Sequence, residues 1–473
     1  MADALVKLRI CPLAPPSGGS AEGLPVLVSV QPPEGSVRTP SHICCLIDIS
    51  WSMSMEAKVQ AASGVVESNG LSMLDVAKHA VRTIIATLGP QDRLSIVEFA
   101  RVAQTVFPPA EMTAAGKILA GEALDGIGFG SGTDLWNGLK EALTCLSKTP
   151  KGLMSHIMLL TDGETENKET IVSNLEGWIK SNGGGIPGTI CCFGFGYEIN
   201  SKMLSDIADL CDGTYAFIPD AGFVGTCFVN SVSNLLVTMA SGAMLTLKAP
   251  DGVEIAEVLG GWEAKRQGGS VTISLGSLQF GQSKDIVLSV NVKSSAETVL
   301  TAQLTYGTLH GAAFTDGAAK FDEELAPLVE PNRCRALVVD ALRKAVSVEM
   351  SVGQQLVKDV AAVVLASLAA QDEKVSALLE DVLGQCTEAL SKTEYYDRWG
   401  RHYIPSVASA HKLQQCNNFK DPGVQLYGSK LFEELRDAAD QAFDTMPTPK
   451  VTPAEYRYLG GNKVIRNPDY VQP

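Results

Sequence analysis

Five oxygen-bearing side chains lie where apolar or glycine-rich segments of the sequence end. They are Asp48, Ser50, Ser52, Thr133 and Asp162. Asp48 and Asp162 each follow an apolar run, and Thr133 follows a glycine-rich turn. Hydroxyl and carboxylate oxygens are the ligands that Mg²⁺ prefers, in octahedral geometry with several retained waters and one or two carboxylates. The five residues therefore predict a divalent-metal site.

The roles of these ligands follow from the small number of acids among them. Ser50 and Ser52 stand on alternate residues, so their hydroxyls and that of Thr133 are expected to coordinate the ion directly. Asp48 and Asp162 are expected to hold metal-bound waters and to balance the charge. An ion with few direct anionic ligands stays electrophilic, and its open position favours a carboxylate from elsewhere. Mg²⁺ is the first expectation, and Mn²⁺ and Ca²⁺ are compatible alternatives.

Three loops must meet for these ligands to converge, and an alternation of strand and helix patterns after Ile43 would bring them together. The expected strands lie at 43–48, 94–99, 156–161, 189–195 and 214–218, and the expected helices at 71–88, 135–146, 171–181, 201–210 and 224–240. Continuously apolar strands separated by helices are typical of a parallel sheet covered on both faces. Ligand sites in such sheets lie at the carboxyl ends of the strands.

The sequence on either side of this region has a different period. Alternating apolar and polar residues predict strands at 6–10, 26–30, 243–249, 252–258, 270–278, 284–292 and 298–307. Apolar residues at three- and four-residue spacing predict helices at 333–351, 353–369 and 372–391. These patterns favour a β-sandwich and a small antiparallel helical module.

The predicted fold class is therefore α/β, with a doubly wound parallel-sheet domain inserted in a β-sandwich and followed by a helical module and an extended tail. The expected boundaries are 1–40 for the amino-terminal strands that join the sandwich, 41–240 for the doubly wound domain, 241–328 for the sandwich, 329–446 for the helical module and 447–473 for the tail rich in proline and tyrosine.

The five ligands resemble the metal-ion-dependent adhesion site of von Willebrand factor A (VWA) domains, whose pattern is D-x-S-x-S, then T, then D. All five positions match in the family's order. The resemblance implies a site that binds protein partners, often through an acidic side chain that completes the metal sphere, and that is not a catalyst.

Three residues beside the ligands are candidates for partner contact. Trp51 stands where the family commonly has glycine, and it could anchor a partner, partly cover the site or pack inward. Asp134 and Glu164 flank the ligands and could add negative charge around the ion, whereas such acids are more often solvated or cap helices.

A second resemblance rests on two blocks rich in aromatic and amide side chains. They are YDRWGRHYIPS at 396–406 and QCNNFKDPG at 415–423. The blocks resemble the carboxyl-terminal module that accompanies A domains in proteins with a Hint self-splicing domain, over about residues 331–449. No Hint-like cysteine context occurs, so self-processing is not implied. The blocks suit a rigid loop-rich core or a partner surface, and packed polar residues are favoured over catalytic pairing of His402, His411 and Cys416.

Composition excludes several classes of protein. The chain has 473 residues, 45% of them hydrophobic, and a net charge of −15. The acidic balance argues against a nucleic-acid binder or an anionic-membrane surface protein. No apolar stretch approaches the roughly 18 residues of a membrane span, and the amino end lacks a continuous signal-like core. We therefore expect an intracellular, cytoplasmic location without membrane insertion.

Cysteine usage and motif content argue against zinc sites and catalysis. The eleven cysteines are expected to be buried reduced thiols, because their number is odd and several stand in apolar runs. No C-x-x-C pair, phosphate-binding loop, H-E-x-x-H helix or nucleophile elbow occurs. We therefore do not expect an enzyme.

Three functions fit these observations. The leading hypothesis is a Mg²⁺-dependent interaction or scaffold protein that binds an acidic residue of an unidentified protein partner. One alternative is a structural subunit of a large assembly with a vestigial metal site, anchored by Tyr456, Tyr458 and Tyr470 in the tail. The other is a non-catalytic adaptor of ubiquitin or processing machinery, because related plant proteins pair A domains with RING fingers and this chain has no RING cysteine pattern.

Overall fold

The computed structural model describes residues 5–13, 21–57, 59–60, 66–67, 70–166, 168–293, 299–453, 455–457 and 464–466. The chain divides into two compact units. The sandwich unit consists of Met1–Arg38 and Val237–Glu433, and the α/β unit consists of Thr39–Leu236 and Glu434–Pro473. Each unit thus combines segments that are far apart in the sequence.

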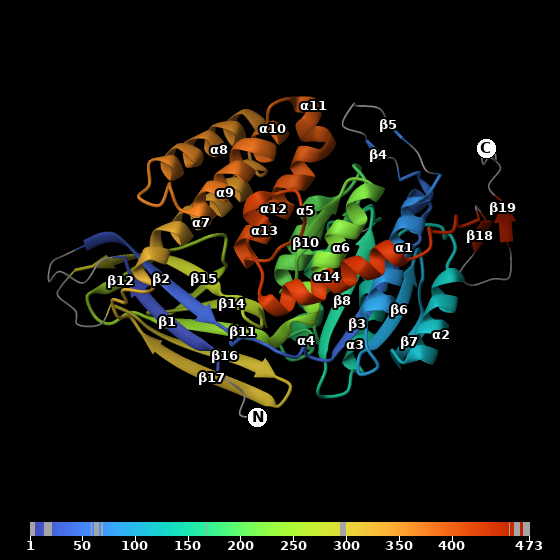
Figure 1. Ribbon diagram of the computed structural model, residues 1–473, viewed down its shortest axis with the longest axis horizontal. Helices are drawn as coiled ribbons and strands as arrows, with labels where there is room; N and C mark the ends of the chain where they lie inside the picture. Colours follow the sequence, from blue (N-terminus) through green and yellow to red (C-terminus); the bar gives the residue numbers. More distant parts are fainter. Residues whose placement is uncertain are drawn as a thin grey trace. The chain divides into compact units, whose positions relative to one another are not determined.

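A six-stranded sheet forms the centre of the α/β unit (Figure 1). In spatial order its strands are β10 (Tyr215–Ile218), β9 (Thr189–Phe195), β8 (Met154–Thr161), β3 (Ser41–Asp48), β6 (Arg93–Phe99) and β7 (Ala103–Glu111). Neighbouring strands are parallel except for β7, which is antiparallel to β6. Every residue of β3 is buried, which explains the apolar run at 43–47 within it.

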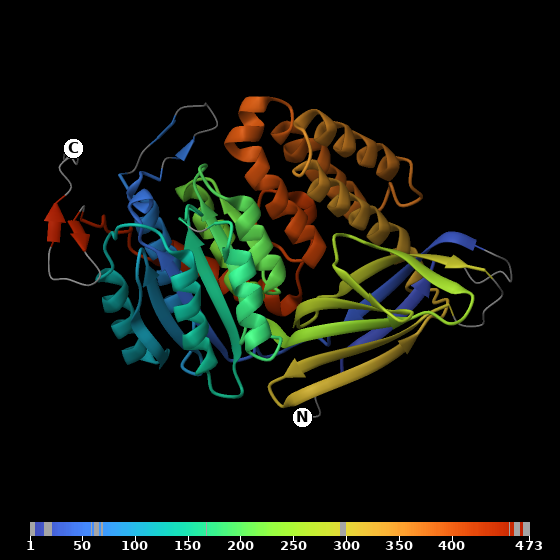
Figure 2. The same cartoon turned by 180° about the vertical axis from the view of Figure 1, so that it is seen from behind.

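Helices flank both faces of this sheet, as the opposite views of Figures 1 and 2 show. They are α1 (Met73–Thr87), α2 (Ala114–Asp125), α3 (Leu135–Ser147), α4 (Ile171–Ser181), α5 (Ser201–Leu210) and α6 (Val224–Leu236). Alternate residues of β3, among them Ile43 and Ile47, share one apolar core with α1 and α6. The predicted doubly wound α/β fold is confirmed.

The pair β7 and α2 was not predicted from the sequence. Strand β7 contains Pro108 and Pro109, and proline is tolerated in a sheet at an edge, where no partner needs its missing N–H. Most of its residues are only half-buried and several are exposed, so the strand lacks the apolar run that marks the central strands.

Two antiparallel sheets make up the β part of the sandwich unit. One has the order β1 (Lys7–Pro12), β2 (Ala21–Gln31), β15 (Lys284–Val292) and β12 (Val253–Leu259). The other has the order β13 (Ala264–Gln267), β14 (Ser270–Gln279), β11 (Thr238–Lys248), β16 (Thr301–Thr308) and β17 (Gly311–Ala318). Side chains from both sheets form one apolar core. Because β2 pairs with β15, the amino-terminal strands join strands that follow the α/β region.

Strands β13 and β17 extend the seven strands that the sequence pattern predicted. Both lie at the edges of their sheet. β13 has only four residues, and the residues of β17 are exposed or half-buried throughout, including its one large apolar residue, Phe314. Neither strand therefore shows an apolar alternation.

Helices follow the second sheet. The longer ones are α7 (Ala326–Ala345), α8 (Met350–Leu365), α9 (Glu373–Asp381), α12 (Arg401–Leu413) and α14 (Lys430–Thr445). Short turns lie between them, namely η3 (Val382–Cys386), α10 (Thr387–Ala389), α11 (Thr393–Tyr395), η4 (Tyr396–Gly400) and α13 (Pro422–Gln425). Helix α7 begins before its expected start and contains Pro331. Proline lacks the N–H that donates a helical hydrogen bond, so the sequence pattern predicted that the helix starts after Pro331.

The two aromatic and amide-rich blocks adopt different structures. The block at 396–406 is helical, spanning η4 and the start of α12, so the expectation of a loop-rich structure was wrong there. Its aromatic rings pack on one another, with the rings of Trp399 and Tyr403 edge to face at 5.6 Å. The block at 415–423 has little regular structure, and the Asn418 side chain accepts hydrogen bonds from the N–H groups of Lys420 and Asp421.

Residues 447–453 have no regular secondary structure. Beyond them β18 (Glu455–Arg457), which contains Tyr456, pairs with β19 (Val464–Arg466). Tyr458 and Tyr470 lie outside the described residues. Within the described part of the chain, no helix is both long and apolar enough to span a bilayer. All eleven cysteines are buried and free.

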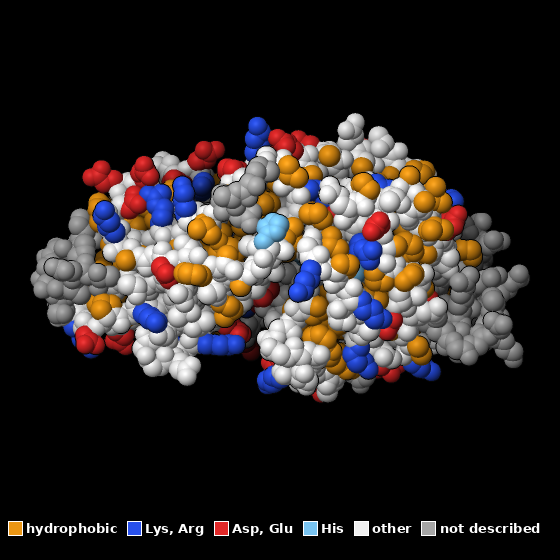
Figure 3. All heavy atoms as spheres, turned by 90° about the horizontal axis from the view of Figure 1, so that it is seen from below, with side chains coloured by type: hydrophobic (Ala, Val, Ile, Leu, Met, Phe, Trp, Pro, Cys, Tyr) orange, Lys and Arg blue, Asp and Glu red, His pale blue; other side chains and the backbone are white. Residues whose placement is uncertain are grey.

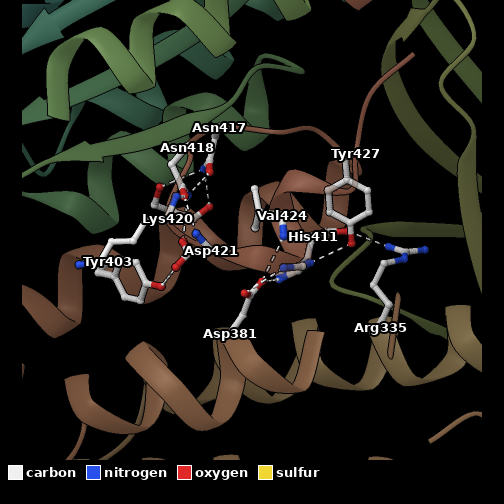
Figure 4. A network of polar contacts seen from close by, with 12 residues as sticks. Arg335, Asp381, Tyr403, His411, Asn417, Asn418, Lys420, Asp421, Val424 and Tyr427 are labelled. Atoms are coloured by element: carbon white, nitrogen blue, oxygen red, sulfur yellow. Dashed lines mark hydrogen bonds and ion pairs between the residues drawn. The ribbon is translucent and has the colours of Figure 1, made fainter. Parts of the chain in front are cut away.

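A buried polar network joins α9, α12 and the segment after α12 in the sandwich unit (Figure 4). Asp381 lies 3.0 Å from Nε2 of His411 and accepts hydrogen bonds from the N–H groups of Gly423 and Val424. Nδ1 of His411 lies 2.8 Å from the Tyr427 hydroxyl. His411 is thus packed in a structural network, as favoured from the sequence over a catalytic pairing.

We predict that Asp381→Ala lowers the free energy of unfolding by about 3 kcal/mol, because it leaves a buried imidazole and two backbone N–H groups without their acceptor. Urea denaturation followed by circular dichroism measures the change. Asp359→Ala, which removes an exposed carboxylate from α8, is the control and should change stability by less than about 0.5 kcal/mol. Equal midpoints for the two variants would show that the network contributes little.

Candidate metal centre

The ends of β3 and β8 bring the two predicted aspartates to one edge of the sheet. The strands are adjacent and parallel, with Ile47 opposite Leu160. Continuing this register by one residue places Asp48 beside Thr161, and the Thr161 hydroxyl donates a 2.6 Å hydrogen bond to Oδ2 of Asp48. Asp162 follows directly. Thr161 was not predicted as a site residue, although the strand register indicates it.

Hydrogen bonds between loops place the Thr133 loop at the same edge. The Gly130 N–H donates to the Ile49 carbonyl at 2.6 Å, which joins this loop to the one after β3. The Thr133 carbonyl accepts from the Glu166 N–H at 3.2 Å and from the Thr165 hydroxyl at 3.1 Å, which joins it to the loop after β8. The three loops that carry the predicted ligands are therefore connected to one another.

Glycine is needed at position 130 because the loops pack so closely there. A Cβ atom at Gly130 would lie 2.7 Å from Cβ of Ala100 and 3.1 Å from Cδ1 of Ile49, which is closer than side chains pack. The glycine at this position thus allows the close approach of the loop.

The two serines and Asp48 form a compact cluster of oxygens. The hydroxyl oxygens of Ser50 and Ser52 lie 3.0 Å apart. Oδ1 of Asp48 accepts a 2.8 Å hydrogen bond from the Ser50 N–H, and the Asp48 side chain is fully buried. Ser52 lies on a short helix, η1 (Trp51–Ser54), which turns its side chain back toward Ser50.

Asp162 contributes an unsatisfied oxygen. The residue is 2% exposed, and its Oδ1 accepts a hydrogen bond from the Glu164 N–H at 3.2 Å. Oδ2 is buried and has no hydrogen-bond partner within the described part of the chain. A buried carboxylate oxygen without a donor is unfavourable unless a cation or water is bound to it.

Burial disfavours the charged form of both acids. Burial raises the pKa of Asp48 to about 7, with a further contribution from the charge of Asp162, although hydrogen bonds from Thr161 and Ser50 oppose the rise. Burial also raises the pKa of Asp162, and hydrogen bonding by the Ser52 hydroxyl opposes that rise. A cation bound between these acids would favour their ionised forms.

These features fit a divalent cation with oxygen ligands. Among the described residues, no three His, Cys, Asp or Glu side chains come together in a way that could hold a metal, so hydroxyls would have to supply part of the ligand set. The paired serine hydroxyls and the unsatisfied Asp162 oxygen meet that requirement.

The three flanking residues lie in different environments. Trp51 is half-buried, with its ring edge-on to Phe129 at 6.0 Å, so it packs against the domain core. Asp134 caps α3, accepting a 3.0 Å hydrogen bond from the Asn137 N–H. Glu164 is exposed. Of the three, Glu164 has the environment that partner contact requires.

Two family models match the chain. Residues 43–164 match the von Willebrand factor type A domain, and residues 372–441 match the family described as VWA / Hh protein intein-like. The first match contains all five predicted ligands. The second contains both aromatic and amide-rich blocks and the Asp381 network.

Curated relatives share parts of the sequence. An uncharacterized protein of Synechocystis is 25% identical over 281 residues, which are 57% of this chain and 62% of that protein. The E3 ubiquitin-protein ligase WAV3 of Arabidopsis thaliana is 30% identical over 148 residues, which are 30% of this chain and 18% of the ligase. The matches thus cover less than two thirds of either relative.

Solved structures share the fold over most of the chain. The von Willebrand factor type A protein from Catenulispora acidiphila has a TM-score of 0.61 and 18% identity, covering 85% of this chain and 96% of that one. The ArnB paralog VWA2 from Sulfolobus acidocaldarius has a TM-score of 0.54 and 14% identity, covering 87% and 99%. The chain therefore carries a von Willebrand factor type A domain together with a VWA / Hh protein intein-like segment.

Proposed function

We propose that this chain is a protein-interaction or scaffold protein that binds an acidic residue of a partner through Mg²⁺ held at the VWA domain. The observation that carries the proposal is the buried Oδ2 of Asp162, which has no hydrogen-bond partner among the described residues and lies in a loop connected to those of the other ligands. The VWA domain by itself favours a role in protein interaction. The bound Mg²⁺ and the acidic residue of the partner are what we add to that role.

The chain's own residues would prepare the site before a partner arrives. The hydroxyls of Ser50, Ser52 and Thr133 would bind the ion directly, and the two aspartates would hold its waters. Asp48 is already oriented, because one oxygen accepts from Thr161 and the other from the Ser50 N–H. Bound Mg²⁺ would supply an electrophilic position with few direct anionic ligands, which favours a carboxylate from the partner.

Charge on the molecular surface supports a protein partner over nucleic acid. On the face drawn in Figure 3, Lys and Arg side chains are interspersed with acidic and apolar ones instead of forming one basic patch. Nucleic-acid binding depends on clustered positive charge, and the chain carries a net charge of −15.

A role as adaptor of ubiquitin machinery is the second candidate. Two of the matched Arabidopsis proteins are named as E3 ubiquitin-protein ligase and probable E3 ubiquitin-protein ligase, with 30% and 32% identity over 30% and 23% of this chain. The adaptor hypothesis and our proposal that the chain is not itself an enzyme share one test. A ligase that co-purifies with the chain would support an adaptor, whereas ubiquitin transfer by the purified chain alone would contradict both.

We predict that Asp162→Asn weakens Mg²⁺ binding at least about tenfold, because it removes the negative charge from the oxygen that lacks a donor. Calorimetric titration with Mg²⁺ and Mn²⁺ gives the dissociation constants. Asp206→Asn changes a partly exposed acid on α5 that pairs with Lys202; it is the matched control and should bind as the unmodified chain does. If the unmodified chain takes up neither ion, the metal proposal is wrong.

We also predict that partner binding depends on the ion. Affinity purification with the unmodified chain should lose its partners when a chelator is added and regain them with excess Mg²⁺. The Asp162→Asn variant should recover few partners under either condition, while Asp206→Asn should recover them normally. Partners that stay bound through chelation would place the interaction on other surfaces and would favour the structural-subunit alternative.

A further inference from the structure

The segment after α14 inserts one side chain into the α/β unit. Thr452 is 8% exposed, whereas its neighbour Val451 is 54% exposed. The Thr452 N–H donates to Oδ1 of Asp75 at 2.7 Å, and the Thr452 hydroxyl donates to the same oxygen at 2.6 Å. A residue near the carboxyl end of the chain is thus hydrogen-bonded to α1 of the VWA domain.

The approach of this segment is fixed by packing upstream. The Phe443 ring lies edge-on to His79 of α1 at 4.9 Å. A Cβ atom at Gly225 of α6 would lie 2.6 Å from the Phe443 ring, so glycine there makes room for the aromatic side chain. Leu435 of α14 packs against the same apolar core.

Asp75 connects Thr452 to the loop of the two serine ligands. Its other oxygen, Oδ2, accepts from the N–H of Ser72 at 2.9 Å, and the Ser72 hydroxyl oxygen accepts from the Asp75 N–H at 3.1 Å, which together form the capping box of α1. The Ser72 hydroxyl also donates to Oδ2 of Asp75 at 2.7 Å. The residue after Ser72 is hydrogen-bonded to the end of the loop that carries Ser50 and Ser52. The Met73 N–H donates to the Met55 carbonyl at 2.9 Å, and Met55 is three residues after Ser52.

Lys78 connects Thr452 to the loop of Thr133. Its ammonium donates to the Thr452 hydroxyl at 3.3 Å and to the Ile127 carbonyl at 2.9 Å. Lys78 is 4% exposed, so its ammonium is largely removed from water. The two acceptors therefore stabilise a charge that would otherwise be unfavourable to bury. Ile127 lies at the start of the segment between α2 and α3 that contains Thr133. In the same segment, the Gly130 N–H donates to the Ile49 carbonyl.

We infer that Thr452 is a positioning residue for the metal site, holding the Ser50–Ser52 loop through Asp75 and the Thr133 loop through Lys78. One hydroxyl, which donates to the acid and accepts from the ammonium, joins the supports of both loops. The inference deepens the proposed function, on which its effect on metal affinity rests. The hydrogen bonds of Thr452 should also limit the opening of both loops in the metal-free protein.

The test is Thr452→Val in the full-length chain. Valine keeps the shape of the side chain and the backbone N–H that donates to Asp75, and it removes only the hydroxyl. We expect amide hydrogen exchange at residues 51–57 and 127–133 of the metal-free protein to rise at least about tenfold, and the Mg²⁺ dissociation constant to rise several-fold. Thr452→Ser restores the hydroxyl and should restore both values.

Thr448→Val, on the exposed part of the same segment, is the matched control and should leave both values unchanged. Unchanged exchange in Thr452→Val would overturn the inference whether or not the chain binds Mg²⁺. An equal rise in exchange across β9 and α5 would also overturn it, because that result indicates general destabilisation. Faster exchange in the two loops of a chain that binds no Mg²⁺ would uphold the positioning role and refute the proposed function.

Discussion

The site depends on keeping two carboxylates buried at the end of a parallel sheet. Asp48 and Asp162 are 0% and 2% exposed, and burial raises the pKa of both. Removing two like charges from water is unfavourable unless donors or a cation compensate, and the cost is several kcal/mol per ion. The protein supplies donors to Asp48 from Thr161 and Ser50, but leaves one oxygen of Asp162 without any among the described residues. The fold thus satisfies both oxygens of one acid and leaves one oxygen of the other for the proposed cation.

The proposed metal binding would require loops that are held rigidly, because neutral hydroxyl ligands bind an ion weakly one by one. Preorganisation lowers the cost of ordering ligands when the ion binds. The backbone hydrogen bonds from Gly130 to Ile49 and from Glu166 to Thr133 provide that order at the sheet edge. The capping box of Ser72 and Asp75 provides further order at the start of α1.

Much of this organisation could be predicted from the sequence, because it depends on local patterns. The apolar runs that end at Asp48 and Thr161 indicate parallel strands whose ends meet, and the five ligands lie in loops that the structure connects at that edge. The edge strands could not be predicted, since β7 has paired prolines and β17 has no buried residue to give an apolar alternation. The helical structure of the block at 396–406 could not be predicted either, because its glycine, proline and aromatic residues carry weak helix signals.

Contacts between residues far apart in the sequence had no local signal. Nothing near Thr452 distinguishes it from Thr448, which also precedes a proline, until the structure shows Asp75 and Lys78 around it. Asp75 likewise has a role that no local pattern indicates. One of its oxygens takes part in the capping box of α1, and the other accepts both hydrogen bonds from Thr452, so a single carboxylate joins the start of α1 to the segment after α14.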